Sequence, residues 1–127
     1  MQNVEFIGPH GRRIALVDLF RGEAAFVGFW SGSSGWPVLQ LDKIAGEIIR
    51  LANASAPVLR MLEVDATALG LSTVSDAAGK LAAVLGLASG TPMFCLLRPD
   101  MHLAARIEQP TAAKVKTALQ RALREGL

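Results

Sequence analysis

Three short, mostly apolar segments limit what this chain can fold into. They span residues 24–30, 58–64 and 93–97, and the first of them contains no polar side chain. A strand of a one-sided sheet alternates apolar and polar residues, whereas a strand that is buried on both faces is apolar at nearly every position. The three segments therefore predict neighbouring strands of a central sheet that is covered on both sides.

Helical periodicity separates these strands. From Trp36 onward, apolar residues recur at the spacing of one helix face, and charged residues take the other face. We expect a second helix with Ser75 as its N-cap, Asp76 in its first turn, where negative charge suits the helix dipole, and Gly86 at its end. A third helix is expected to end at Gly126.

A predicted hairpin completes the sheet. The turn-forming residues Arg98, Pro99 and Asp100 follow the strand 93–97, and the chain returns as a strand over 102–107. The order is then β-α-β-α-β-β-α after a short N-terminal unit. Strands that are separated by helices pair in parallel through crossover connections. The sequence therefore predicts a single α/β domain over 1–127, with a small mixed central sheet and helices on both faces.

Composition and charge exclude several classes of protein. The chain of 127 residues is 51% hydrophobic and 19% charged, which indicates a folded domain rather than a disordered one. The net charge is only +2, the cations are scattered and tyrosine is absent, so we expect no nucleic-acid partner. No apolar run reaches the roughly 20 residues of a membrane helix, and the N-terminus lacks the pattern of a signal peptide. We expect a cytoplasmic protein that does not associate with membranes.

The first predicted strand and the loop after it resemble the active-site region of thioredoxins. In that family a strand ending in Phe-Trp runs into a Cys-x-x-Cys motif at a helix N-terminus. Here the strand ends in Phe29-Trp30, but Ser34 stands near the first cysteine position, and Trp36 or Pro37 stands at the second. The resemblance implies a thioredoxin-like fold from which the redox cysteines are absent.

Two further positions belong to this resemblance. Gly28 stands where thioredoxins carry a buried aspartate that relays protons, and Pro92 stands where they have a cis-proline facing the active site. The resemblance implies a cis peptide bond between Thr91 and Pro92. It also implies that the loop 31–35 and Pro92 lie face to face across a shallow groove.

A longer motif lies in the C-terminal third. Arg98-Pro99-Asp100, followed by an Ala-Ala-Arg sequence that ends at Arg106, is similar to a signature near the end of FAD-dependent aromatic-ring hydroxylases. Met101 departs from that signature, which usually has glycine at this position. If the turn needs a positive φ, methionine strains it by roughly 1 kcal/mol or more.

This second resemblance covers nearly the whole chain and implies the C-terminal thioredoxin-like domain of an FAD- and NAD(P)H-dependent monooxygenase. The parent enzyme would hydroxylate a phenolic ring. This domain, with no catalytic, cofactor-binding or metal-binding residues of its own, would pack against the FAD and substrate domain and help to form a homodimer. It lacks the Gly-x-Gly-x-x-Gly motif and is expected to bind no FAD. The alternative is a stand-alone thioredoxin- or peroxiredoxin-like protein, or a binding module, that has lost its Cys-x-x-Cys site.

Few side chains offer chemistry of their own. Cys95 lies in mid-strand without a second thiol, so we expect it to be buried and inert; the alternative, a one-cysteine peroxidase, would place its thiol at a helix N-terminus. Ser33 and Ser34 precede a helix and are expected to cap it, unless their loop holds an anion or one of them acts as a nucleophile. Two histidines and one cysteine without close spacing do not make a zinc site.

The remaining candidates are contact residues. Arg98 and Asp100 either stabilise their own turn or form an ion pair with another domain, and His102 projects into solvent or into a subunit contact. Trp36 lies either in an interface or in the core at the start of a helix. The residues expected at an interface or a vestigial site are Ser33, Ser34, Trp36, Pro92, Arg98, Asp100 and His102.

Overall fold

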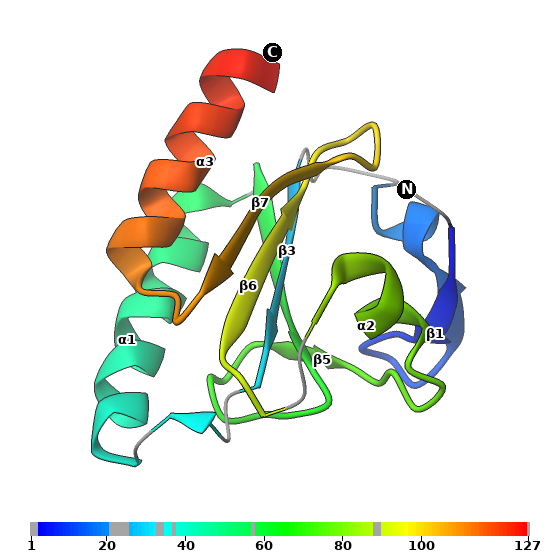
Figure 1. The fold of residues 1–127 in the computed structure, drawn as a ribbon, viewed down its shortest axis with the longest axis horizontal. Coiled ribbons are helices and arrows are strands. Elements are labelled where there is room, and N and C mark those ends of the chain that lie inside the picture. The colour runs from blue at the N-terminus through cyan, green and yellow to red at the C-terminus, as the bar shows by residue number, and fades with distance from the viewer. Residues whose placement is uncertain are drawn as a thin grey trace.

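A five-stranded mixed sheet forms the centre of the molecule. The structure, a computed structural model, describes residues 3–20, 26–32, 35–36, 38–56, 58–87 and 90–126. The strands of the sheet are β3 (Phe26–Ser31), β4 (Leu59–Val64), β5 (Ser72–Val74), β6 (Met93–Leu97) and β7 (Leu103–Glu108). They lie in the order β5-β4-β3-β6-β7 (Figure 1). β3, β4 and β5 are parallel, and β6 is antiparallel to both β3 and β7.

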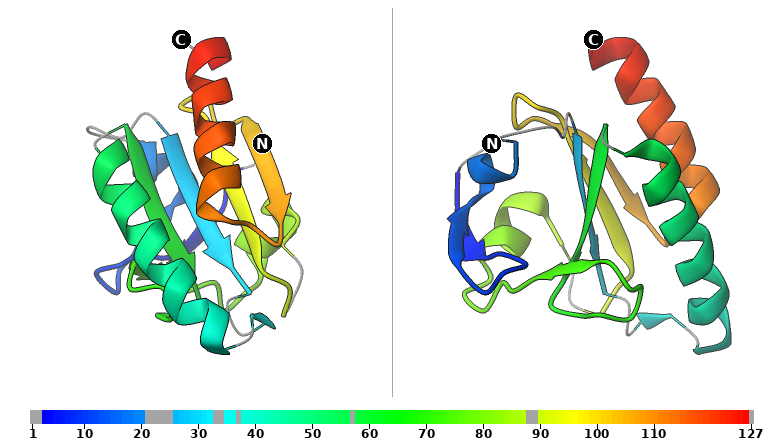
Figure 2. Two further views of the ribbon diagram at one scale, coloured as in Figure 1. Left: turned by 90° about the vertical axis from the view of Figure 1, so that its left-hand side faces the viewer. Right: turned by 180° about the vertical axis from the view of Figure 1, so that it is seen from behind.

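Two layers cover the sheet (Figure 2). Two long helices lie on one face, whereas a short helix, a small hairpin and a 3₁₀ turn lie on the other (Figure 1). The first layer consists of α1 (Val38–Ser55) and α3 (Ala112–Gly126), and the second of β1 (Glu5–Ile7), β2 (Arg13–Ala15), η1 (Leu16–Phe20) and α2 (Lys80–Leu85). This is the α/β architecture that the sequence predicts.

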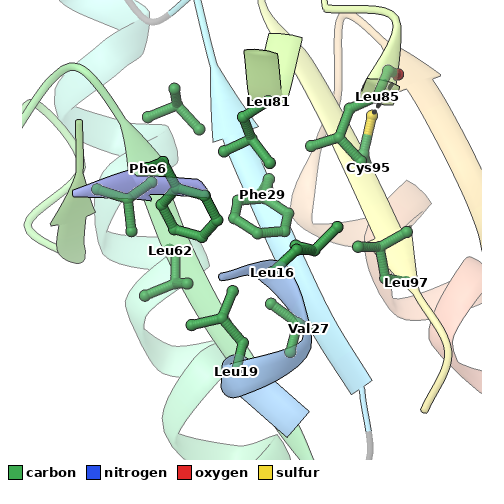
Figure 3. Packing of buried hydrophobic residues seen from close by; sticks show 12 residues of the cluster. Phe6, Leu16, Leu19, Val27, Phe29, Leu62, Leu81, Leu85, Cys95 and Leu97 are labelled. Carbon is green, nitrogen blue, oxygen red and sulfur yellow. Dashed lines mark hydrogen bonds between the residues drawn. The ribbon is translucent and has the colours of Figure 1, made fainter. Parts of the chain in front are cut away.

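The central strand β3 contributes side chains to both layers. Val27 and Phe29 lie in the cluster between the sheet and the layer of α2, together with Cys95 of β6 (Figure 3). Phe26 and Trp30 lie in the opposite cluster, under α1 and α3. Full burial of an apolar side chain of this kind contributes about 1.5–3 kcal/mol. Burial on both faces is the reason for the continuous apolar run, and the three predicted strands are confirmed as neighbours.

The second helix is shorter than expected, and its N-cap is Gly79 rather than Ser75. α2 has six residues, and the carboxylate of Asp76 accepts hydrogen bonds from the backbone N–H groups of Leu81 and Ala82, both at 2.9 Å. Ser75 instead exchanges backbone hydrogen bonds of 3.0 and 2.8 Å with Ile7. The expected N-cap is therefore wrong, because pairing with the N-terminal hairpin draws Ser75 away from the helix. Asp76 likewise precedes the helix instead of lying in its first turn.

The C-terminal hairpin follows the prediction closely. β7 begins at Leu103 rather than at His102, and the β6–β7 register shifts between Leu96 and Leu97, next to the turn. Among the described residues, no helix combines the length and the hydropathy that a membrane span requires.

Candidate functional site

The carboxyl end of β3 meets the segment that leads into β6, and we call this contact the β3–β6 junction. Gly32 has a φ of +70°, and a Cβ atom there would collide with the carbonyl group of Thr91. A Cβ atom on Gly35 would collide with the carbonyl group of Gly90 and would lie 2.8 Å from Cδ of Pro92. The two segments therefore lie face to face, but in direct contact rather than across the expected shallow groove, because glycine lets their backbones touch. Ser33, Ser34 and Pro37 of this loop lie outside the described residues.

An aromatic cluster lies beneath the junction, on the face of the sheet that α1 and α3 cover. The ring centroid of Trp30 is 4.7 Å from that of Phe94 and 6.3 Å from that of Trp36. Trp36 is only 7% exposed. Of the two positions expected for it, an interface or the core, it therefore lies in the core. The indole Nε1 of Trp30 and the hydroxyl of Ser31 are buried without a hydrogen-bond partner in the described part of the chain.

Gly28 leaves no room for an acidic side chain. A Cβ atom at this position would lie 2.6 Å from Cε1 and Cζ of the Phe94 ring, which is well inside van der Waals contact. The place where thioredoxins carry their buried aspartate is thus filled by a phenylalanine ring from β6. A proton relay through this position is excluded by packing.

Glu63 is a buried carboxylate that the sequence reasoning missed. It is 0% exposed and stands beside Trp30 in the register of β3 and β4. Its two carboxylate oxygens accept hydrogen bonds from the backbone N–H groups of Ala68 (3.1 Å) and Leu69 (2.9 Å). These bonds hold the loop after β4 against the end of the sheet. One sequence feature could have pointed to it: Glu63 is a charged residue that interrupts the apolar pattern near the end of the predicted strand 58–64.

Cys95 is buried on the other face of the sheet. It is 0% exposed, and its Sγ lies 3.5 Å from the carbonyl oxygen of Leu85, to which the thiol donates (Figure 3). Burial raises the pKa of this thiol from 9.0 to about 11, and the positive charge of Arg106 offsets only part of that effect. Cys95 packs against the layer of α2, whereas Trp30 and Trp36 lie in the layer of α1 and α3. The expectation of a buried Cys95 is confirmed.

The turn between β6 and β7 is stabilised from within. Nη2 of Arg98 donates to the Asp100 carboxylate at 2.8 Å, and that carboxylate also accepts the backbone N–H of His102 at 3.1 Å. Nδ1 of His102 lies 3.3 Å from the same group. The hydrogen bond from the His102 backbone, with smaller help from the charge of Arg98, lowers the pKa of Asp100. Arg98 and Asp100 thus form an ion pair inside their own turn.

Met101 adopts the backbone conformation that was expected to be unfavourable. Its φ is +64°, the left-handed region in which residues other than glycine cost roughly 1–2 kcal/mol. Its side chain is partly buried against the cluster that contains Cys95. The apolar burial of this side chain acts against the cost of the backbone conformation.

The expected site residues therefore fall into separate places. Trp36 and Pro92 belong to the β3–β6 junction and the aromatic cluster under it, whereas Arg98, Asp100 and His102 form the β6–β7 turn. In the ranges that the structure describes, no group of three His, Cys, Asp or Glu side chains is arranged to bind a metal ion.

Comparison with known proteins decides between the two resemblances. No protein-family model and no curated protein matches the chain. Solved structures do match, among them a thioredoxin-like protein from Aeropyrum pernix, with a TM-score of 0.67 and 9% identity over 94% of this chain and 89% of that one. The fold is thioredoxin-like.

Two further structures agree with this thioredoxin-like assignment. Peroxidoxin BcpB from Mycobacterium tuberculosis gives a TM-score of 0.69 at 16% identity, over 98% of this chain and 94% of that one. ScoI from Arabidopsis thaliana with copper bound gives 0.66 at 11% identity, over 98% of each chain. At such identities the likeness establishes the fold and leaves the activity open.

The expected membership of the aromatic hydroxylases is wrong. The similar solved structures are thioredoxin-like proteins in their own right rather than domains of flavin hydroxylases. The structure explains why the motif at Arg98-Pro99-Asp100 misled, since these residues serve the geometry of a tight turn. The role as an accessory domain of such a hydroxylase is wrong with it.

Proposed function

We propose that this thioredoxin-like protein acts by binding and performs no thiol–disulfide chemistry. The observation that carries the proposal is the position of its one cysteine: Cys95 is fully buried in the middle of β6, and its pKa is raised to about 11 by that burial. A redox thiol must be exposed and must ionise near neutral pH. Cys95 meets neither requirement.

The β3–β6 junction supports the proposal independently. Thioredoxin chemistry needs an attacking thiolate and a resolving thiol, and the loop 31–37 contains no cysteine. The position of the proton-relaying aspartate is occupied by Gly28, against which the Phe94 ring packs. Both the nucleophile and the group that would manage its proton are replaced. What remains at the junction is the close backbone contact of Gly32 and Gly35 with the segment before β6.

Two standard assays test this proposal. Purified protein is added to insulin with dithiothreitol, and separately to hydrogen peroxide with a thiol reductant, with an active dithiol thioredoxin and a peroxidase as positive controls. The expected rates equal those of the protein-free blank. The matched control is Cys95→Ala, which removes the thiol at a position that is already apolar. A protein-dependent rate in either assay that disappears in Cys95→Ala would overturn the proposal.

A further inference from the structure

A pocket between β7 and α3 combines small apolar walls with two positive charges. It lies on the same face of the sheet as α1, where α3 runs beside β7 (Figure 2), and its volume is about 210 Å³. The alanine methyl groups are too short to close the gap between strand and helix. The side chains that matter here are Leu103, Ala105, Ala118, Ala122, Arg98 and Arg121.

Arg98 brings an unused donor to this pocket. Its Nη2 is engaged by Asp100 at 2.8 Å, but its Nε–H is buried and has no acceptor within the described residues. A buried donor on a charged group is costly to leave without a partner, and hydrogen bonds that involve ionised groups are the strong ones. The Nε–H is closed off from the pocket space in this conformation, so an oxygen atom of a ligand would satisfy this donor after a rotation of the Arg98 side chain.

Arg121 brings a second, uncompensated charge. It extends from α3, and no ion pair of the described residues involves it. No acidic side chain is found among the described residues of the lining. Asp100 already compensates the charge of Arg98, so the charge that an anion in the pocket would neutralise is that of Arg121.

We propose that this pocket binds a small carboxylate that carries a short apolar group. The carboxylate lies between Arg98 and Arg121, because a planar guanidinium matches the two oxygens of a carboxylate. The apolar part lies against Leu103 and the alanines. Phosphate fits less well, since the walls offer no further donors for its additional oxygens. The inference supplies a ligand class for the binding role proposed above and rests on it.

A titration followed by NMR tests the assignment. Uniformly ¹⁵N-labelled protein is titrated at constant ionic strength with sodium benzoate, sodium butyrate, benzamide and sodium phosphate. The carboxylates are expected to shift the Nε–H signals of Arg98 and Arg121 and the amides of Ala105 and Ala118 in a saturable way. Benzamide, which has the same shape as benzoate without its charge, is expected to cause no saturable change.

Three variants separate this site from general attraction to a basic helix. Arg121→Ala is expected to weaken carboxylate binding at least tenfold, and Ala118→Leu, which fills the pocket without changing charge, is expected to abolish it. Arg124→Ala removes a cation of the same helix that is outside the lining and is expected to leave the affinity within twofold. Because Arg121 is exposed, its alanine variant should fold even if Ala118→Leu does not.

Each contrary outcome has a defined meaning. The inference is overturned if no carboxylate saturates, if benzamide or phosphate binds as well as benzoate, or if Arg124→Ala weakens binding as much as Arg121→Ala does. Absence of carboxylate binding in a protein that is silent in both redox assays overturns this inference alone. Thiol-dependent activity overturns the proposed function, whatever the titration shows.

Discussion

Cys95 and Glu63 are both fully buried, but they differ in the hydrogen bonds that their side chains make. The thiol of Cys95 has one weak acceptor, the carbonyl oxygen of Leu85, and it packs among the apolar side chains of the α2 layer. The carboxylate of Glu63 accepts two backbone hydrogen bonds from the loop after β4. At the scale of single residues, burial therefore disables one group as a nucleophile and makes the other a structural anchor.

Native Cys95 is expected to resist alkylation. A pKa of about 11 in place of 9.0 lowers the thiolate fraction at pH 8 by a factor on the order of 10², and burial denies access to the reagent. Labelling with iodoacetamide followed by mass spectrometry should therefore be negligible in buffer and rapid in 8 M urea, a concentration chosen to unfold the chain. Rapid labelling of the folded protein would contradict this picture.

The same raised pKa predicts a loss of stability in alkali. The unfolded thiol ionises above about pH 9, whereas the folded thiol ionises only near pH 11. The folded state therefore binds one more proton between these values, and the free energy of unfolding falls across that window by up to about 2–3 kcal/mol. Urea unfolding of the wild type and of Cys95→Ala at pH 8 and pH 10.5 isolates this effect, because the variant should lack it. The absence of tyrosine keeps the window free of phenol ionisation.

At the scale of elements, Glu63 is expected to hold the loop 65–71 in place through its hydrogen bonds to Ala68 and Leu69. Glu63→Gln leaves one carbonyl oxygen in place of two carboxylate oxygens, so one of the amides of Ala68 and Leu69 loses its charged acceptor. We expect a loss of about 1–3 kcal/mol in the free energy of unfolding, together with faster amide hydrogen exchange at these two residues. Glu108→Gln on the exposed part of β7 is the control and should change neither.

The cap of α2 offers a second prediction at this scale. Asp76→Ala removes the acceptor of two backbone N–H groups at the start of the helix and is expected to cost about 1–2 kcal/mol. Ser75→Ala should cost little, because Ser75 pairs with Ile7 through backbone atoms. Chemical unfolding of the two variants measures the difference. Equal losses, or a greater loss in Ser75→Ala, would restore the serine as the cap.

These elements show what could be predicted from sequence. β3, β4 and β6 were found because burial on both faces leaves an apolar pattern that is local and strong. The residue that caps α2 was not predicted correctly. Serine and aspartate are both favoured at the start of a helix, and only the contact of Ser75 with Ile7 decides between them. Glu63 interrupts the apolar pattern of its strand, but the loop amides that it binds leave no trace in the sequence, so its role could not be predicted.

At the scale of the whole molecule, the features that could not be predicted depend on contacts between residues far apart in the sequence. Arg98 and Arg121 are far apart in the chain, yet both line the pocket between β7 and α3. The hydroxylase resemblance failed for the opposite reason, since a local turn was taken as the mark of a larger enzyme. The thioredoxin-like fold was predictable because it follows from the order of the elements.

The two-sided core also determines what spectroscopy can see in this protein. Both tryptophans lie in the layer of α1 and α3, whereas the thiol lies in the layer of α2. Intrinsic fluorescence therefore reports on one layer, and thiol labelling reports on the other. Since β3 contributes Val27 and Phe29 to one layer and Phe26 and Trp30 to the other, we expect the two probes to give the same urea midpoint. Labelling that precedes the fluorescence change would reveal that the layer of α2 opens while the tryptophans are still enclosed.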